Sequence, residues 1–190
     1  MVMPSTAPVI KKYTLAEFWA LPEPADHSKL ELINGVLHMS PPPEWSHSRR
    51  ASGLVRRIIA MLIAAADQGQ LFFPRAAIWT SRHTYLEPDL FYVSAELLAR
   101  LDPKRPETAD LVIEIVSPGT AIYDYNTKAD AYGNLGVREL WLVDEGNGTV
   151  EVRYQIGKGF GEKAVFRGGE AVRSRVWPDI ELTPDQVFSD

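Results

Sequence analysis

The segment LVIEIV at residues 111–116 constrains the fold of this chain more than any other stretch. Apart from Glu114 it is continuously apolar, which is typical of a strand that is covered on both faces of its sheet. A helical pattern follows over residues 121–135, and a second apolar segment follows at residues 139–143. A strand, a helix and a strand in this order predict a right-handed crossover between parallel strands. We therefore expect an α/β (α+β) fold with a mixed central sheet flanked by helices.

Local signals on either side of this core predict the other elements. Asn34-Gly35 separates two short apolar segments, which indicates an N-terminal β-hairpin with a type I′ turn. Apolar residues recur at three- and four-residue steps over residues 46–68, which predicts a long helix, and Gly69 is well placed to end it. Residues 149–188 are read as further short strands with glycine turns, a β-rich C-terminal tail. Shorter helices are expected near residues 15–20 and 95–101, and strands near residues 71–73, 76–80 and 89–93.

The composition is that of an ordinary globular protein. The chain has 190 residues, 45% of them hydrophobic and 24% charged, and no cysteine. This length suits a single domain over residues 1–190, with residues 1–12 as a flexible N-terminus. A chain without cysteine cannot use a thiol nucleophile, an iron–sulfur cluster or a Cys-rich zinc site. The net charge of −5 means that nucleic-acid binding would need local positive charge or a bound cation.

The apolar segments are too short to cross a membrane. The longest uninterrupted apolar run, residues 58–66, has nine residues, whereas a spanning helix needs about 20. Residues 1–12 have no apolar segment followed by a small-residue cleavage site, so they do not match a signal peptide. We therefore expect a cytoplasmic protein without a membrane partner.

Glu114 is the residue that does not match its surroundings. An ionised carboxylate in an apolar strand requires a charged partner, a metal ion or a raised pKa. Asp89 offers a second carboxylate, at the start of another predicted strand. Two carboxylates that converge from neighbouring strands provide the oxygen ligands that Mg²⁺ and Mn²⁺ prefer. The residues alone equally allow Glu114 to pair with a buried arginine or lysine, and Asp89 to cap a turn.

The 25-residue spacing of Asp89 and Glu114 resembles the core motif of the PD-(D/E)xK nucleases. In that superfamily the two acids bind metal, and a lysine two residues after the second acid assists the attacking water. Val116 stands at that position here, and Lys128 lies fourteen residues beyond Glu114, in the following predicted helix. A long and flexible lysine side chain can bring its ammonium group to the same point from a helix.

This departure from the motif is itself part of a wider resemblance. The chain is similar almost end to end, over about residues 13–188, to the Uma-two family of restriction-endonuclease-like proteins, in which the lysine has migrated in this way. The matching positions are LELING at 30–35, His47, EPDL at 87–90, LVIEIVSPGT at 111–120, Asp124, Lys128, Tyr132, GV at 136–137 and ELWLVD at 139–144. Gly119 and Leu140 depart from the family pattern, which usually has a small hydroxyl residue and an aromatic residue there. The resemblance implies a restriction-endonuclease-like fold and a Mg²⁺-dependent endonuclease that hydrolyses DNA.

The resemblance also implies a metal site. Asp89, Glu114 and the backbone carbonyl of Ile115 would bind Mg²⁺ or Mn²⁺, because carboxylate and carbonyl oxygens suit these cations. Glu31, which the resemblance adds to the catalytic residues, would hold a second ion or orient water between metal and protein. The residues alone also allow Glu31 to be a surface acid of the hairpin beside Lys29.

By this resemblance, Lys128 would be the partner of the attacking hydroxide or of the scissile phosphate. An ion pair with Asp124, four residues earlier on a solvated helix face, is the alternative. Further candidate substrate contacts lie beside these residues, and they are His47, Arg49, Ser117, Thr120 and Tyr132. Each has a structural alternative: helix entry, a solvated helix face, helix capping or packing.

Partners and competing functions follow from the same reading. DNA is the implied partner, and cuts on opposite strands would be easiest for a symmetric homodimer. Three other functions stay open. They are a catalytically inactive DNA-binding or scaffolding module that retains the fold, a glycosidase with two carboxylates about 5–10 Å apart, and a hydrolase of small nucleotides. Metal titration, resistance to EDTA and dependence on substrate length would separate them.

Overall fold

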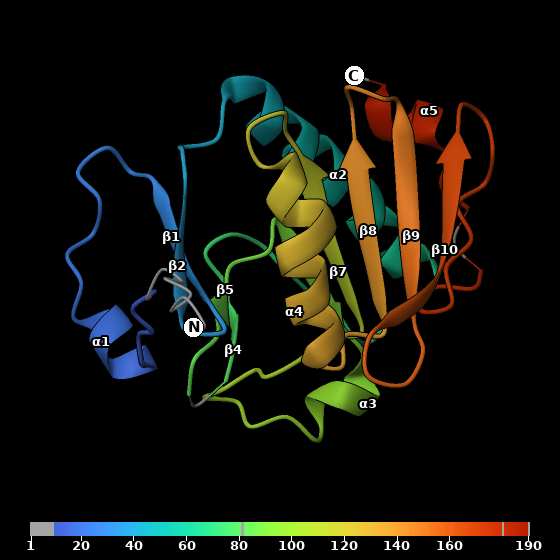
Figure 1. Ribbon diagram of the computed structural model, residues 1–190. Helices are drawn as coiled ribbons and strands as arrows, with labels where there is room; N and C mark the ends of the chain where they lie inside the picture. Colours follow the sequence, from blue (N-terminus) through green and yellow to red (C-terminus); the bar gives the residue numbers. More distant parts are fainter. Residues whose placement is uncertain (1–9, 81, 180, 190) are drawn as a thin grey trace, which may run out of the picture.

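The computed structural model describes residues 10–80, 82–179 and 181–189, and its core is a six-stranded mixed sheet (Figure 1). In spatial order its strands are β10 (Phe160–Arg167), β9 (Thr149–Gln155), β8 (Glu139–Asp144), β7 (Leu111–Val116), β6 (Leu90–Val93) and β3 (Gln70–Phe72). β7 and β8 are parallel neighbours, and all of their residues are buried. The other neighbouring pairs are antiparallel. The expected central strand pair and mixed sheet are confirmed.

A second sheet of four short strands lies beside this core. Its strands, in order, are β2 (Val36–Ser40), β1 (Lys29–Ile33), β5 (Tyr85–Leu86) and β4 (Ile78–Trp79). β1 and β2 form the expected hairpin, with Asn34 and Gly35 at φ 51° and 82°, as a type I′ turn requires. β4 lies within the strand expected near residues 76–80, whereas β5 and the sheet itself were not predicted, because a strand of two residues is too short to show a periodicity.

Helices cover both faces of the central sheet, and α1 (Leu15–Trp19) packs against β1 of the second sheet. The helices on the central sheet are α2 (Trp45–Ala64), α3 (Ala95–Leu98), the π-helical turn η1 (Tyr123–Lys128), α4 (Ala129–Asn134) and α5 (Pro184–Phe188). α2 packs Leu54 and Ile58 on one face. η1 and α4 pack Ala129 and Tyr132 on the opposite face, in front of the sheet in Figure 1.

Two expectations about element ends are wrong. α2 ends at Ala64 and not near Gln68, and Ala66, at φ 53°, takes the left-handed conformation expected for Gly69. Gly69 is needed for another reason, because a Cβ atom there would collide with the Tyr92 hydroxyl.

The C-terminal tail is also less β-rich than expected. Strands continue only through residue 167, and the described residues after it contain no strand and end in α5. Thr183 and Gln186 form a capping box at the start of α5, with Pro184 as its first residue. This local signal is present in the sequence and outweighs the short apolar pattern.

Some expectations fall outside what the structure tests. Residues 1–9 of the expected flexible N-terminus lie outside the described residues, and the single domain over residues 1–190 stays a prediction. No helix in the described part of the chain is long and apolar enough to cross a membrane.

Candidate active site

Three elements meet at one edge of the central sheet, at the top of Figure 1. They are the carboxyl end of β7, the amino end of α2 and the amino end of the helical segment that contains η1. Side chains alternate along β7, so Glu114 points to the same face as Val112 and Val116, the face covered by α4. Its carboxylate oxygen Oε1 accepts a hydrogen bond of 2.6 Å from the Tyr132 hydroxyl. Glu114 is therefore directed at the helix that follows it.

Lys128 is the centre of a buried ionic cluster. Its ammonium nitrogen lies 3.0 Å from Asp124 Oδ1, 3.3 Å from Glu114 Oε1 and 3.4 Å from Glu31 Oε2. All four side chains are 5% exposed or less. Glu114 thus has the buried lysine partner that the structural alternative required, and this partner is the lysine that the resemblance selected. The ion pair with Asp124 forms, but inside the protein rather than on a solvated helix face.

The segment after β7 contains a π-helical turn with two buried charged groups. The sequence predicts an ordinary helix over residues 121–135, whereas a π-helix occupies residues 123–128. Asp124 and Lys128 in this turn are buried, and Tyr132 follows on the same side in α4, as side chains spaced four residues apart do on a helix. Single π-helical turns inside α-helices are frequent at functional sites.

Asp89 lies immediately before β6, on the more open side of the cluster. Its oxygen Oδ2 accepts a hydrogen bond of 2.7 Å from the Ile115 N–H, and His47 Nε2 lies 3.3 Å from the same oxygen. The Asp89 side chain is 13% exposed and His47 is 21% exposed. Asp89 therefore does not cap a turn, and it joins β7 to the amino end of α2.

The contact between Asp89 and His47 shifts the pKa of both groups. Burial would raise the pKa of Asp89, but His47, Lys29 and the Ile115 N–H bring it below its usual value. The hydrogen bond to Asp89 raises the pKa of His47 against the effect of burial, and a hydrogen bond to the backbone of Ile115 adds to the rise. His47 therefore holds two groups, Asp89 and Ile115, that the resemblance assigns to a metal ion.

Glu31 enters the cluster from β1 and is not a surface acid. The Glu87 N–H donates to its oxygen Oε1 at 2.9 Å, and Lys29 Nζ lies 3.8 Å from the same oxygen. Lys29 also donates to the Glu87 carbonyl at 2.8 Å. Lys29 is missing from the predicted site residues, although residues two apart on a strand share a face. Lys29 is the second lysine of this site.

Burial and neighbouring charges act in opposite directions on the pKa values of the central groups of the cluster. Burial raises the pKa of Glu114 to about 8, although the charge of Lys128 acts against this rise. Burial would lower the pKa of Lys128, but Glu114, Glu31 and Asp124 raise it well above its usual value. Lys128 therefore keeps its charge at neutral pH. Burial and the nearby carboxylates also raise the pKa of Tyr132, so its hydroxyl remains a donor.

The donors of the cluster suit a hard divalent cation in type and charge. The carboxylates of Glu31, Asp89, Glu114 and Asp124 outnumber the two lysines when all are ionised, and Mg²⁺ prefers oxygen ligands. The buried Asp124 Oδ1 has an ion pair but no hydrogen-bond partner in the described part of the chain. A preformed coordination shell is absent among the described residues, since no three acidic or histidine side chains are grouped to hold a metal. The metal ligands named by the resemblance therefore stay a prediction.

The remaining candidate contacts occupy the surroundings of the cluster. Ser117 and Thr120 make a helix cap, with their hydroxyl oxygens 2.9 Å apart and the Ala121 N–H bonded to the Ser117 carbonyl. Arg49 is exposed on α2. His38, which sequence analysis did not select, lies directly opposite Glu31 in the β1–β2 register. The cross-strand pairing in the predicted hairpin was the signal that could have found it.

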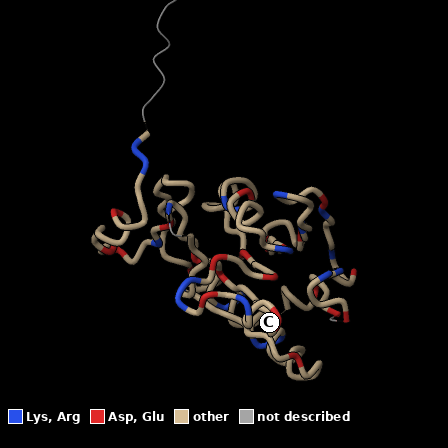
Figure 2. Tube along the Cα trace, turned by 90° about the horizontal axis from the view of Figure 1, so that it is seen from below, with Lys and Arg blue, Asp and Glu red and all other residues tan. Residues whose placement is uncertain are grey.

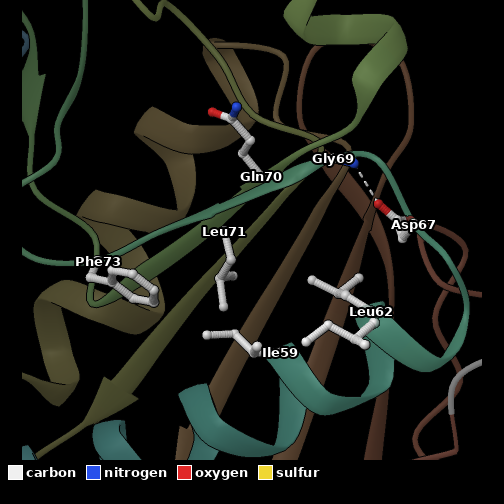
Figure 3. Close-up of a pocket in the computed structure, with 8 residues that line it drawn as sticks. Ile59, Leu62, Asp67, Gly69, Gln70, Leu71 and Phe73 are labelled. Carbon is white, nitrogen blue, oxygen red and sulfur yellow. Dashed lines mark hydrogen bonds between the residues drawn. The ribbon is translucent and has the colours of Figure 1, made fainter.

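The rest of the surface offers weaker candidates. Basic and acidic positions are interspersed along the chain (Figure 2). A shallow hollow between α2 and β3 is lined mainly by apolar residues such as Ile59 and Leu71 (Figure 3). Its acid, Asp67, accepts hydrogen bonds from the Gly69 N–H at 2.6 Å and from the Tyr92 hydroxyl at 2.7 Å. Asp67 thus has a structural role, because it joins the loop after α2 to Tyr92 of β6. We therefore do not place the active site there.

Comparisons with known proteins agree with this architecture. The mixed sheet, the helices on both faces and the acids at the end of β7 define a restriction-endonuclease-like α+β fold. The chain belongs to the Uma2 family, described as "Putative restriction endonuclease", whose model matches residues 15–185. A crystal structure from Anabaena variabilis, described as "a putative nuclease belonging to DUF820", is similar with a TM-score of 0.73 and 23% identity, and the match covers 92% of this chain and 97% of that chain. No curated protein matches the sequence significantly. The expected family and fold are confirmed.

Proposed function

We propose that this protein is a Mg²⁺- or Mn²⁺-dependent endonuclease that hydrolyses DNA phosphodiester bonds. The observation that carries the proposal is the buried cluster in which Lys128 meets three carboxylates at 3.0–3.4 Å beside Asp89. Burying so many charges is costly, and a well-packed apolar core would stabilise the fold at least as well. Strongly perturbed groups gathered at one edge of a sheet are typical of active sites, and the family description points to DNA cleavage.

The geometry supports a division of roles among these residues. Asp89, Glu114 and the Ile115 carbonyl would hold the cation, which when bound lowers the pKa of water and neutralises charge on the phosphate. Lys128, kept charged by its carboxylates, would stabilise negative charge on the attacking oxygen or on the phosphate. Glu31 and Asp124 orient the Lys128 ammonium group.

Two residues around the cluster would act by positioning. Tyr132 fixes the Glu114 carboxylate through its 2.6 Å hydrogen bond. His47 would direct the Asp89 carboxylate from the amino end of α2.

The direct test is cleavage of plasmid and linear DNA with Mg²⁺ or Mn²⁺, and with EDTA. Asp89→Asn and Glu114→Gln should each lower the rate roughly 100-fold or more, because each removes a charged ligand while keeping the side-chain shape. Glu151→Gln is the matched control, since Glu151 is also buried and bonded to two cations, but on β9. Unchanged rates in both site variants, or cleavage that persists in EDTA, would overturn the proposal.

A catalytically inactive DNA-binding module is the second candidate. The absence of a preformed metal shell among the described residues favours it. Calorimetric titration with Mn²⁺ separates the two functions: an ion that binds wild type but not Asp89→Asn supports the nuclease, and no binding at saturating metal supports the module.

The proposal extends to the assembly and the location of the protein. We infer a symmetric homodimer, because two such sites can cut both strands of a duplex. Light scattering after gel filtration tests it, and a monomeric mass at working concentration would contradict it. A cytoplasmic location belongs to the same proposal, since a chain without cysteine suits a reducing compartment.

A further inference from the structure

Two aromatic rings border the ionic cluster on its solvent side. The His38 and Tyr123 rings are 5.4 Å apart, with their planes at 77°. His38 is paired in register with Glu31, and Tyr123 directly precedes Asp124 in η1. The ring pair is therefore attached to the same two backbone segments that supply two of the carboxylates around Lys128.

Of the two rings, that of Tyr123 reaches the surface. Tyr123 is 45% exposed and the adjacent Ile122 is 70% exposed. Exposed apolar side chains that gather beside a polar site mark a binding surface more often than singly scattered ones do. Tyr123 thus offers an exposed planar side chain beside the cluster.

The charges behind the rings restrict what can bind to them. Glu31 lies opposite His38 in the strand register, and Asp124 follows Tyr123 in η1. Their carboxylates would repel a phosphate group placed over the two rings. An uncharged nucleobase meets no such repulsion, and every base has a flat face that stacks on aromatic side chains. The phosphate would instead approach from the side of Asp89, where Lys29 is 25% exposed.

We infer that Tyr123 with His38 stacks an unpaired nucleobase next to the cluster, so that the site takes a DNA strand whose bases are unpaired where it is cut. This inference rests on the proposed nuclease function. In a duplex the faces of the bases are covered by their neighbours, and a ring can reach them only after the base leaves the stack. The burial of the cluster agrees, since Glu31 and Glu114 are 1% and 2% exposed, and a flexible single strand can reach buried groups more readily than a rigid duplex.

Binding assays without turnover test the inference. Fluorescence anisotropy in EDTA would compare a labelled oligothymidylate, an abasic oligonucleotide of the same length and a duplex. We expect wild type to bind the oligothymidylate roughly tenfold more tightly than the other two. Tyr123→Ala should weaken that binding about 5- to 100-fold and leave binding of the abasic oligonucleotide unchanged, while Tyr123→Phe should keep the wild-type affinity.

The control variant is Trp19→Ala. Trp19 is 56% exposed and also sits in an edge-to-face ring pair, with Trp79, but it lies in α1, which is attached to the turn end of the hairpin through the Tyr13 N–H and the Gly35 carbonyl. This variant should bind like wild type.

Several results would overturn the inference. They are equal affinity for the oligothymidylate and the abasic oligonucleotide, tighter binding of the duplex, no binding of any of the three, or unchanged affinity in Tyr123→Ala. Because the assay needs neither metal nor cleavage, its failure is distinct from a failure of the proposed nuclease. If the protein cleaves DNA with Mn²⁺ but its affinity for an oligonucleotide does not depend on the presence of bases, only the stacking site is refuted.

Discussion

Replacing Lys128 with methionine is the sharpest test of how the buried cluster is held together. Methionine keeps much of the apolar stem and removes the charge that lies 3.0–3.4 Å from three carboxylates. Breaking a buried ion pair by removing one partner costs about 3–5 kcal/mol, because the other charge is left uncompensated. We expect the free energy of unfolding to fall by about this amount near neutral pH, out of a typical total of about 5–15 kcal/mol.

The loss should depend on pH with a definite sign. Burial already raises the pKa of Glu114 to about 8 against the charge of Lys128, and removing the ammonium group raises this pKa further. A carboxyl group with a raised folded pKa stabilises the fold below its unfolded pKa, and this contribution is lost as the pH rises through the folded pKa. The deficit of the variant relative to wild type therefore grows as the pH rises through about 8.

Urea denaturation at several pH values, followed by tryptophan fluorescence, measures this difference. Lys163→Met is the control, because Lys163 Nζ lies 3.2 Å from Glu151 but its side chain is 61% exposed, so its loss should cost less than about 1 kcal/mol. A Lys128→Met deficit below about 1 kcal/mol at neutral pH, or a deficit that stays constant as the pH is raised, would refute the reasoning.

Three further predictions concern the metal, the hydrogen bond inside the cluster and two glycines. Mn²⁺ at about 100 times its dissociation constant should stabilise wild type by about 2.7 kcal/mol, seen as a higher Tm that EDTA reverses, and a shift retained in Asp89→Asn would contradict the assigned ligand. Tyr132→Phe should cost about 1.5–3 kcal/mol, since a 2.6 Å hydrogen bond to a buried carboxyl group is lost; urea unfolding checks this, and no change would mean that the bond contributes nothing. Gly69→Ala should cost about 1–3 kcal/mol through its collision with the Tyr92 hydroxyl. In Gly53→Ala the new Cβ atom, inside α2, meets no atom within 4 Å, and the variant should be more stable than wild type by about 0.5–1 kcal/mol. Unfolding temperatures that shift in the same direction in the two glycine variants would contradict this prediction.

Local patterns in the sequence were sufficient for the centre of the fold. The apolar run at residues 111–116 and the segment at residues 139–143 predicted two buried strands, and the structure pairs them in parallel. Asn34-Gly35 predicted the hairpin turn, because its geometry depends on two adjacent residues. Where contacts between distant segments decided the outcome, prediction was poorer, as with the two-residue strand β5, which pairs with β1 and β4, and the end of α2 at Ala64.

The sequence by itself determined which residues are the candidates for chemistry, since an isolated carboxylate such as Glu114 in an apolar strand is visible without coordinates. Family resemblance added Glu31 and Lys128 to the same list. Only the tertiary structure decided how these groups meet, because Glu31, Glu114 and Lys128 come from a hairpin, a central strand and a π-helical turn. The number of residues between them in the chain does not give the distance between their side chains. It likewise placed His38 opposite Glu31 and His47 against Asp89. Electrostatic and packing interactions act through space, so the partners of a buried charge follow from the fold and not from its neighbours in sequence.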